Sequence, residues 1–227
     1  MSVERWAAPG PYAVFFSDRL GGVSEGPYAS LNVGLLTDDD AERVAENRRR
    51  LYEAAGADAE RVSWPRQVHG AAVVRANGRG EPADAIWTDE PGRALVVVTA
   101  DCLPVALARL DGPPALALVH VGWRGLAAGM VSAAVGAIGG RLVAAIGPGI
   151  GPCCYEVRGD VSALFDQALV RNGRLDLPGA VERALRAAGV ERVDRLDECT
   201  ACHPEHYFSH RRTGGVTGRQ AAIGYVA

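Results

Sequence analysis

Three residues that can bind a metal or transfer protons each stand beside an apolar run. Cys102 precedes LPVALARL, His120 lies at the end of PALALVHV, and His69 ends VSWPRQVH. One thiolate and two imidazoles fill three positions of a tetrahedral zinc site and leave the fourth for water, as in catalytic zinc sites. A Cys–His pair also serves as a nucleophile and its base. Spacing alone leaves both chemistries open, together with a plain structural role for each histidine.

Cys102 and His120 are expected to lie side by side on a β-hairpin. Their two apolar runs are separated by DGPP, and Asp-Gly between alternating apolar runs indicates a hairpin turn. A turn centred near Asp111 places Cys102 directly opposite His120, with Cβ atoms ~4.5–5.5 Å apart. A slip of one residue would put the two side chains on opposite faces. Asp101, next to Cys102, either orients the thiol or caps the strand.

A second group of candidate ligands lies near the carboxyl end. CTACH at 199–203 matches the haem c attachment pattern, but that chemistry requires an export signal, which MSVERWAAPG does not resemble. The same stretch, continued to His206, offers four ligands for a structural zinc: Cys199, Cys202, His203 and His206. We expect the adjacent Cys153 and Cys154 to be buried small residues, since neighbours do not easily bridge each other.

Length and composition predict one well-buried domain over residues 1–227. The chain has 227 residues and a hydrophobic content of 48%. Its net charge of -3 argues against a general binder of nucleic acid or membrane surfaces, which needs a dense basic patch. We find neither a secretory signal nor an apolar run of ~18 residues, and therefore expect a cytoplasmic protein. In a reducing compartment, five cysteines favour ligation or catalysis over disulfides.

The elements that must position these side chains mix strands and helices. Strands are predicted at 12–17, 62–70, 71–76, 95–102, 103–110, 114–121, 141–146, 193–196, 206–210 and 221–227. Helices are predicted at 37–56, 124–140, 160–171 and 176–189. The order lacks strict βαβ alternation, which predicts a single layered α/β domain with a mixed sheet.

Nearly the whole chain resembles the YfiH, or laccase-domain, family. The resemblance is carried, in the family's order, by FSDRLGGVSEGPYASLNVG, AENRRRL, WPRQVHG, TADCLPV, HVGWRGLAAGMV, AAIGPGIGPCCYEV and CTACHPEHYFSHRRTGGVTGRQAAIGYV. The family is described under the names multicopper polyphenol oxidase and purine nucleoside phosphorylase. The resemblance implies an α/β domain of three or four layers, related to the CNF-type cysteine hydrolase fold. It also implies a zinc ion held by His69, Cys102 and His120, and these residues with Asp101 form the expected catalytic group.

The activity that the resemblance implies is phosphorolysis of adenosine, inosine, guanosine and S-methyl-5'-thioadenosine, with deamination of adenosine to inosine. Purine nucleosides and phosphate are thus the expected partners. Arg48 matches the family's NR motif and is the candidate phosphate clamp, the alternative being an exposed helix arginine. Asn32 either binds ribose hydroxyls or shapes its loop. Arg124 is expected to face the pocket from a helix start, and Trp123 to fill the core or stack on a base.

The carboxyl-terminal stretch departs from the family pattern, because His210 stands where the family usually has Tyr. Three alternatives stay open. These are a cysteine hydrolase or deamidase in which His120 activates Cys102, a laccase-like polyphenol oxidase, and a factor that edits peptidoglycan precursors. Five histidines are too few for the sites of a four-copper oxidase. Zinc is the expected cofactor, although the donors also suit copper. We expect a monomer or a weak homodimer.

Overall fold

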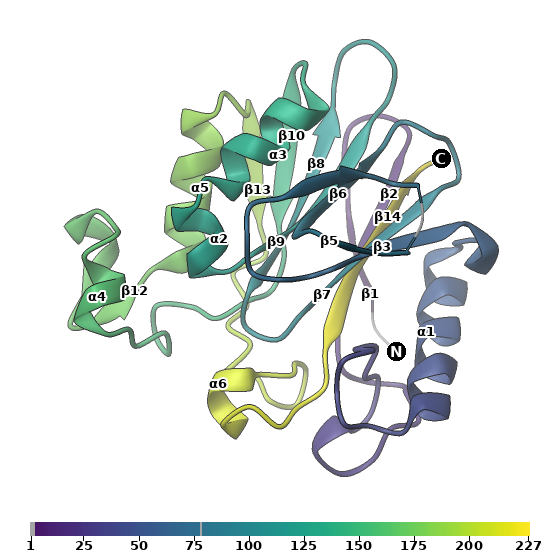
Figure 1. Ribbon diagram of the computed structural model, residues 1–227, viewed down its shortest axis with the longest axis horizontal. Helices are drawn as coiled ribbons and strands as arrows, with labels where there is room; N and C mark the ends of the chain where they lie inside the picture. The colour runs from purple at the N-terminus through teal and green to yellow at the C-terminus, as the bar shows by residue number, and fades with distance from the viewer. Residues whose placement is uncertain (1–2, 78) are drawn as a thin grey trace.

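Two six-stranded mixed sheets pack against each other in the computed structural model, which describes residues 3–77 and 79–227 (Figure 1). The first sheet has the order β1 (Val3–Trp6), β2 (Tyr12–Ser17), β14 (Gln220–Val226), β7 (Ala94–Thr99), β3 (Val62–Arg66) and β5 (Arg79–Pro82). The second has the order β13 (Arg192–Arg195), β10 (Leu142–Ile146), β8 (Leu103–Arg109), β9 (Leu116–Val121), β6 (Ala85–Thr88) and β4 (Val73–Arg75). Strands β11 (Val170–Arg171) and β12 (Arg174–Leu175) form a separate small hairpin.

Helices cover the outer face of each sheet and make four layers. Helix α1 (Ala41–Ala55) lies on the first sheet, where Leu51 packs with Val96 and Ile223. Helices α3 (Met130–Ile138) and α5 (Leu177–Ala187) cover the second sheet, with α2 (Trp123–Ala127) beside them (Figure 1). The remaining helices are short: α4 (Gly159–Ser162), α6 (His210–Thr213), and the 3-10 turns η1 (Gly26–Tyr28), η2 (Ala59–Arg61) and η3 (Gln167–Leu169). No helix in the described ranges is long and apolar enough to cross a membrane.

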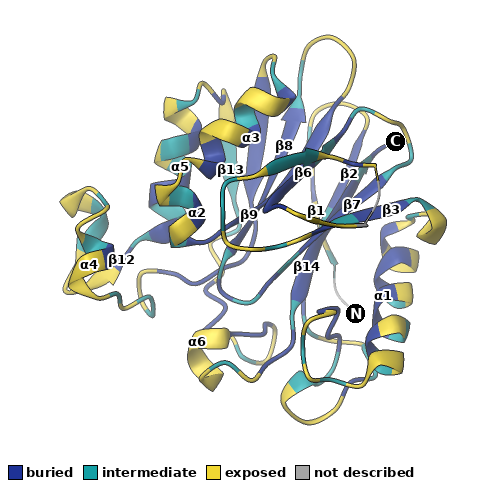
Figure 2. Ribbon diagram, viewed as in Figure 1, coloured by how far each residue is buried: buried dark blue, intermediate teal, exposed yellow. Residues whose placement is uncertain are grey.

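The alternation of β9 decides where His120 points. Leu116 and Leu118 pack between the two sheets, whereas Ala117 and Val119 belong to the core under the helices. Side chains along a strand alternate between its faces, so His120 shares the intersheet face with the two leucines. Figure 2 shows the strands buried along most of their length and the outer helix faces exposed. His120 therefore closes one end of the intersheet core.

The hairpin of β8 and β9 forms, but the predicted register is wrong. His120 pairs with Pro104, and β8 begins only at Leu103, so Cys102 does not lie directly opposite His120. The turn is centred on Gly112 rather than Asp111, because the Arg109 N–H donates to the Ala115 carbonyl. Relative to the prediction, the pairing moves by two positions. Because the side-chain period of a strand is also two, Cys102 stays on the face of His120 as its diagonal neighbour.

Helix α1 begins later than predicted, after its N-cap. The Asp40 carboxylate accepts from the N–H groups of Glu42 and Arg43, and the helix ends at Gly56, which has a left-handed φ of 67°. The predicted helix at 124–140 is divided into α2 and α3, since Gly129 has a φ of 86°. A φ in this range cannot continue a right-handed helix.

Two predicted elements near the carboxyl end are wrong. The helix at 160–171 is reduced to α4 and η3, since Leu164 is 56% exposed and the segment buries too little apolar surface to stabilise a longer helix. The strand at 206–210 does not form. The Gln220 side chain accepts from the Phe208 N–H and donates to the Phe208 carbonyl, which replaces the hydrogen bonds of a neighbouring strand. Strands β1, β5, β6, β11 and β12 were not predicted.

Candidate functional site

The three predicted ligands converge at one end of the two packed sheets. His69 follows β3 of the first sheet, Cys102 lies in the crossing from β7 to β8, and His120 stands near the end of β9 in the second sheet. Their ligand atoms all lie within 4.8 Å of one another. The two imidazole rings meet edge to face, with centroids 4.8 Å apart. The structure thus gathers the three side chains from segments of both sheets.

Asp84 fixes this arrangement, and sequence reasoning did not find it. The side chain has no exposed surface, and its Oδ1 lies 2.7 Å from Nδ1 of His120. The same carboxylate accepts from the backbone N–H groups of Val68, His69 and Gly70. The only signal in the sequence is an acid placed between apolar residues in PADAIW. Asp84 thus orients the ring of one ligand and the backbone of another.

Backbone strain and close approach restrict two positions at the site. His69 has a φ of 60°, in the left-handed region that few residues with a side chain adopt. The three backbone hydrogen bonds to Asp84 hold the chain in this conformation. At position 122, a Cβ atom would lie 2.9 Å from Sγ of Cys102. Only glycine leaves room there for the thiol.

Cys102 and His120 each stabilise the charged form of the other. Burial raises the pKa of the Cys102 thiol, but the charge on His120 and hydrogen bonds from His120 and His69 outweigh it and lower the pKa to about 6. Burial lowers the pKa of His120, but the Cys102 charge and hydrogen bonds to Asp84 and Cys102 raise it to about 9. A thiolate beside an imidazolium is therefore the neutral-pH form of the metal-free pair. The thiolate is the form that binds metals and attacks carbon.

A cavity of about 670 Å³ opens beside the three ligands. This volume suits a small-molecule ligand. Aromatic side chains in its wall include Trp64, Trp123 and Tyr155. Five arginines among the described residues also line it: Arg48, Arg66, Arg124, Arg211 and Arg219. Guanidinium groups bind phosphate through paired donors, and aromatic faces suit a flat ring. The cavity therefore suits a ligand with an anionic group and a planar group.

Arg48 is buried, so the alternative of an exposed helix arginine is wrong. Its guanidinium donates to the Val33 carbonyl at 2.8 Å and lies 4.4 Å from the centroid of the Trp64 ring. Arg219, which sequence reasoning missed, donates to the carbonyls of Thr217 and Gly218. Burial lowers the pKa of the Arg219 guanidinium. Both arginines are thus held in place at the cavity wall.

Asp101 and Asn32 are engaged in structural contacts. The Asp101 carboxylate accepts from the Thr200 hydroxyl at 2.7 Å and from the Arg211 N–H at 2.6 Å. These bonds tie the β7–β8 crossing to the carboxyl-terminal segment. The Asn32 amide donates to Thr37 and Asp39, and its oxygen accepts from the N–H groups of Gly34 and Arg219. The contacts of Asn32 favour a role in shaping its loop.

Arg124 and Trp123 begin α2 at the cavity wall. Arg124 is exposed, as expected for a residue that reaches the pocket from a helix start, and its guanidinium carbon lies 4.7 Å from the Trp123 ring centroid. Trp123 both lines the cavity and packs against the core under the helices. The two roles considered for Trp123 are therefore compatible. His210, at the start of α6, also lines the cavity.

Comparison with known proteins finds a matching family model and a group of similar proteins. A family model described as multi-copper polyphenol oxidoreductase laccase matches residues 13–227. The protein named purine nucleoside phosphorylase YfiH in Escherichia coli (strain K12) is 36% identical over 237 residues, with 97% of this chain and 96% of the relative covered. A purine nucleoside phosphorylase of Streptomyces coelicolor is 42% identical over 231 residues, with 93% of each covered.

Solved structures share the fold over nearly the full chain. The crystal structure of YlmD from Geobacillus stearothermophilus superposes with a TM-score of 0.91 at 33% identity, covering 100% of this chain and 96% of that chain. A Bacillus licheniformis structure described as hypothetical protein YfiH gives a TM-score of 0.89 at 26% identity, covering 95% and 93%. The predicted α/β fold of YfiH type is confirmed.

Replacing Asp84 by Asn should lower the pKa of His120 in metal-free protein. The variant keeps the side-chain shape but removes the negative charge that stabilises the imidazolium. NMR titration of the His120 ring should therefore give a midpoint below the value of about 9 expected for the unmodified protein. Asp89→Asn is the control, since Asp89 pairs with Arg75 at an exposed position. An unchanged His120 titration in Asp84→Asn would contradict the role of Asp84.

The alkylation rate of Cys102 should depend on pH as expected for a thiol of low pKa. In metal-free protein, modification by iodoacetamide should accelerate as the pH rises through about 6, because the thiolate is the reactive form. Peptide mass spectrometry separates Cys102 from the other four cysteines. In His120→Ala the pH at which the alkylation rate reaches half its maximum should rise toward ~8.5, the pKa of an ordinary thiol. A midpoint near ~8.5 in the unmodified protein would refute the ion pair.

Proposed function

We propose, because the chain belongs to the family described as multi-copper polyphenol oxidoreductase laccase, that it is a purine nucleoside phosphorylase. The proposed substrates are adenosine, inosine, guanosine and S-methyl-5'-thioadenosine, and adenosine is also deaminated to inosine. The observation that carries the proposal is the convergence of His69, Cys102 and His120 beside an arginine-lined cavity. The names of the Escherichia coli and Streptomyces coelicolor relatives support the reaction class.

The donor set fits a zinc ion held by His69, Cys102 and His120. Asp84 occupies Nδ1 of His120, which leaves Nε2 to face the other two ligands. Burial of the thiol is offset by two neighbouring imidazoles, so Cys102 is ready to ligate as a thiolate. A zinc ion held by these three residues would supply Lewis-acid chemistry and would activate water. Zinc is our proposal, although the same donors suit copper.

In phosphorolysis, a phosphate oxygen bonds to ribose C1' while the C1'–N9 bond breaks and the purine leaves with the electron pair. The departing purine takes up one proton. Arg48 and Arg219 hold the phosphate, because two fixed guanidinium groups at the cavity wall offset its charge. Trp123 and Tyr155 orient the base against their rings. In deamination, water adds at C6 of adenine and ammonia leaves.

A second candidate function, hydrolysis of an amide by a cysteine nucleophile, is favoured by the order of three neighbouring side chains. Asp84, His120 and Cys102 form a continuous acid–imidazole–thiol series, which is the arrangement of a cysteine hydrolase. In that reaction Cys102 attacks an amide carbonyl, the amine leaves, and water releases the acyl group. This candidate requires a metal-free site, whereas phosphorolysis is proposed for the zinc-loaded protein. Detection of an acyl-enzyme on Cys102 would favour it.

Zinc-loaded protein incubated with adenosine should yield adenine and ribose 1-phosphate only when phosphate is present. Inosine should form with or without phosphate, because deamination consumes adenosine and water and uses no phosphate. Chromatography of the products measures both reactions. Cys102→Ala should lose both bound zinc and turnover, since it removes one of three ligands. Full activity in a metal-free preparation would refute the proposal. A zinc-loaded preparation that forms no product from all four nucleosides, each tested in turn, would also refute it.

Arg48→Ala should raise the KM for phosphate about 10–100-fold, the range expected when a hydrogen bond to a charged group is lost. Arg49→Ala is the matched control on the same helix, because the Arg49 side chain is exposed and pairs with Glu46. Steady-state kinetics with phosphate as the varied substrate measures the effect, and a melting temperature confirms that each variant is folded. An equal KM for phosphate in both variants would exclude Arg48 as the clamp.

A further inference from the structure

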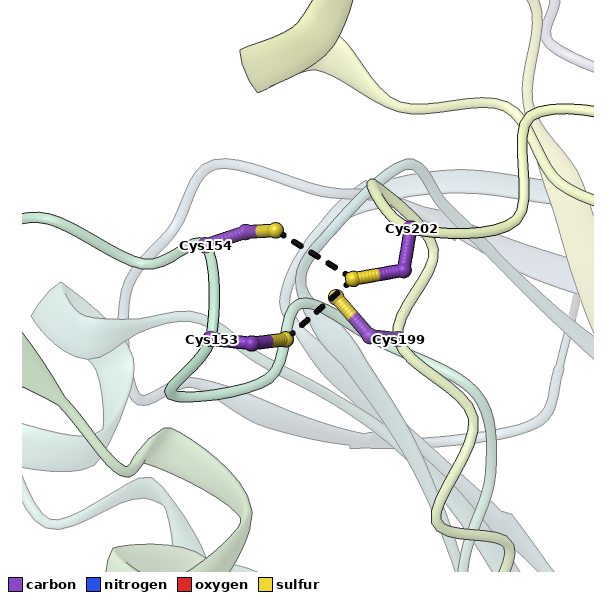
Figure 3. A group of neighbouring side chains, drawn as sticks. All are labelled: Cys153, Cys154, Cys199 and Cys202. Atoms are coloured by element: carbon purple, nitrogen blue, oxygen red, sulfur yellow. Dashed lines mark hydrogen bonds between the residues drawn. The ribbon is translucent and has the colours of Figure 1, made fainter.

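We propose that Cys153, Cys154, Cys199 and Cys202 bind a second zinc ion, outside the cavity. Their four sulfur atoms all lie within 4.8 Å of one another. Figure 3 shows two cysteines on the loop after β10 and two on the segment before α6, with the thiols turned toward one another. The loops are far apart in the sequence and meet at this point. A set of four cysteines is a common structural zinc site.

The spacing of the sulfurs fits one tetrahedral ion. With Zn–S bonds of about 2.3 Å, the edges of the tetrahedron measure about 3.8 Å. Sγ of Cys202 lies 3.3 Å from that of Cys153 and 3.4 Å from that of Cys154. Cys202 thus has two nearly equidistant neighbours, so no single disulfide partner is distinguished. An iron–sulfur cluster places several atoms between its cysteine ligands and needs a wider arrangement.

The surrounding backbone is shaped to hold thiolates. The Gly151 N–H donates to Sγ of Cys199 at 3.2 Å, a bond that stabilises negative charge on sulfur. A Cβ atom at position 151 would lie 3.4 Å from Sγ of Cys153 and 3.3 Å from Cβ of Cys199. Glycine therefore lets the loop approach the sulfurs closely. In the C-x-x-C turn, the Cys202 N–H donates to the Cys199 carbonyl at 3.1 Å, which points both thiols to one side.

This ligand set corrects two expectations from the sequence. His203 and His206 are not in the cluster, and His203 instead lies near the carboxylates of Glu198 and Glu205. Cys153 is exposed and Cys154 is half-buried, so neither is the buried small residue expected. Two exposed thiols, Cys153 and Cys202, give a metal ion access from solvent.

The proposed ion would connect the two segments that hold the Cys102 crossing. The Ile150 N–H donates to the Asp101 carbonyl at 2.8 Å, and the Thr200 hydroxyl donates to the Asp101 carboxylate at 2.7 Å. Tyr155, directly after the cysteine pair, lines the cavity. Zinc binding replaces up to four thiol protons with one ion and cross-links both segments. The site is therefore structural, and it stiffens one wall of the cavity.

The test compares two double variants that each remove two ligands. Cys199→Ser/Cys202→Ser disrupts the four-cysteine cluster, and His69→Ala/Cys102→Ser is the matched control for the cavity cluster. Zinc content is measured by mass spectrometry of the metal in full-length protein purified under reducing conditions without a histidine tag. Cobalt(II) is then exchanged for zinc, because four thiolates give a far stronger sulfur-to-cobalt charge-transfer absorption than one thiolate does.

We expect Cys199→Ser/Cys202→Ser to lose one equivalent of zinc and most of the charge-transfer absorption. The control should keep the zinc equivalent of the four-cysteine cluster and most of the absorption, whatever metal the cavity site of the unmodified protein holds. Failure of the proposed phosphorylase function would therefore leave this result unchanged. If the first variant does not fold, Cys153→Ser/Cys154→Ser removes the other half of the cluster at more exposed positions.

Three results would overturn the proposal. One is equal zinc content in the unmodified protein and in a folded variant of the four-cysteine cluster. Another is iron with acid-labile sulfide in the purified protein. The third is a disulfide among the four cysteines in protein kept under reducing conditions, detected as the loss of two hydrogens by intact mass.

Discussion

The carboxylate of Asp84 joins the two sheets at the point where the ligands meet. It accepts three backbone N–H groups from the segment after β3 and bonds the ring of His120 on β9. A buried carboxylate is costly unless it is fully hydrogen-bonded, and these four bonds meet that requirement. Because one group serves both histidines, the orientation of His120 depends on the conformation of His69. The positions of His69 and His120 are therefore coupled, although the two residues come from different sheets.

Alternation along strands made part of this site predictable. The prediction that Cys102 and His120 share a face survived an error in register because the error equalled the side-chain period. His69 was proposed as a third ligand from its position at the end of a predicted strand. Only the family resemblance placed it beside the other two ligands, since nothing in local spacing links a residue after β3 to a hairpin. Asp84 was not found, because its bond to His120 spans 36 positions and leaves no periodic signal. The strand expected at 206–210 failed for a similar reason, since a distant Gln220 side chain takes the bonds of a strand.

The segment that crosses from β7 to β8 makes contacts on both of its sides, and these contacts restrict its conformation. On the cavity side it places Cys102 between two imidazoles, and on the other side Asp101 bonds Thr200 and the start of α6. Asp101 has a φ of 88°, which a residue with a side chain adopts only when its surroundings hold it there. The chain passes between sheets within three residues, so rigidity at this crossing sets the position of the thiol.

The permanent cations that line the cavity are arginines, and the chain contains 24 arginines and no lysine. A guanidinium keeps its charge across the whole range in which proteins stay folded, whereas a buried lysine can lose its own. The arginine contribution to the positive field of the cavity is therefore constant with pH. Acetylation, which neutralises lysine side chains, has no side-chain target in this protein. A change of anion affinity with pH would then report the ionisation of groups other than arginine, among them the anion itself and the Cys102–His120 pair.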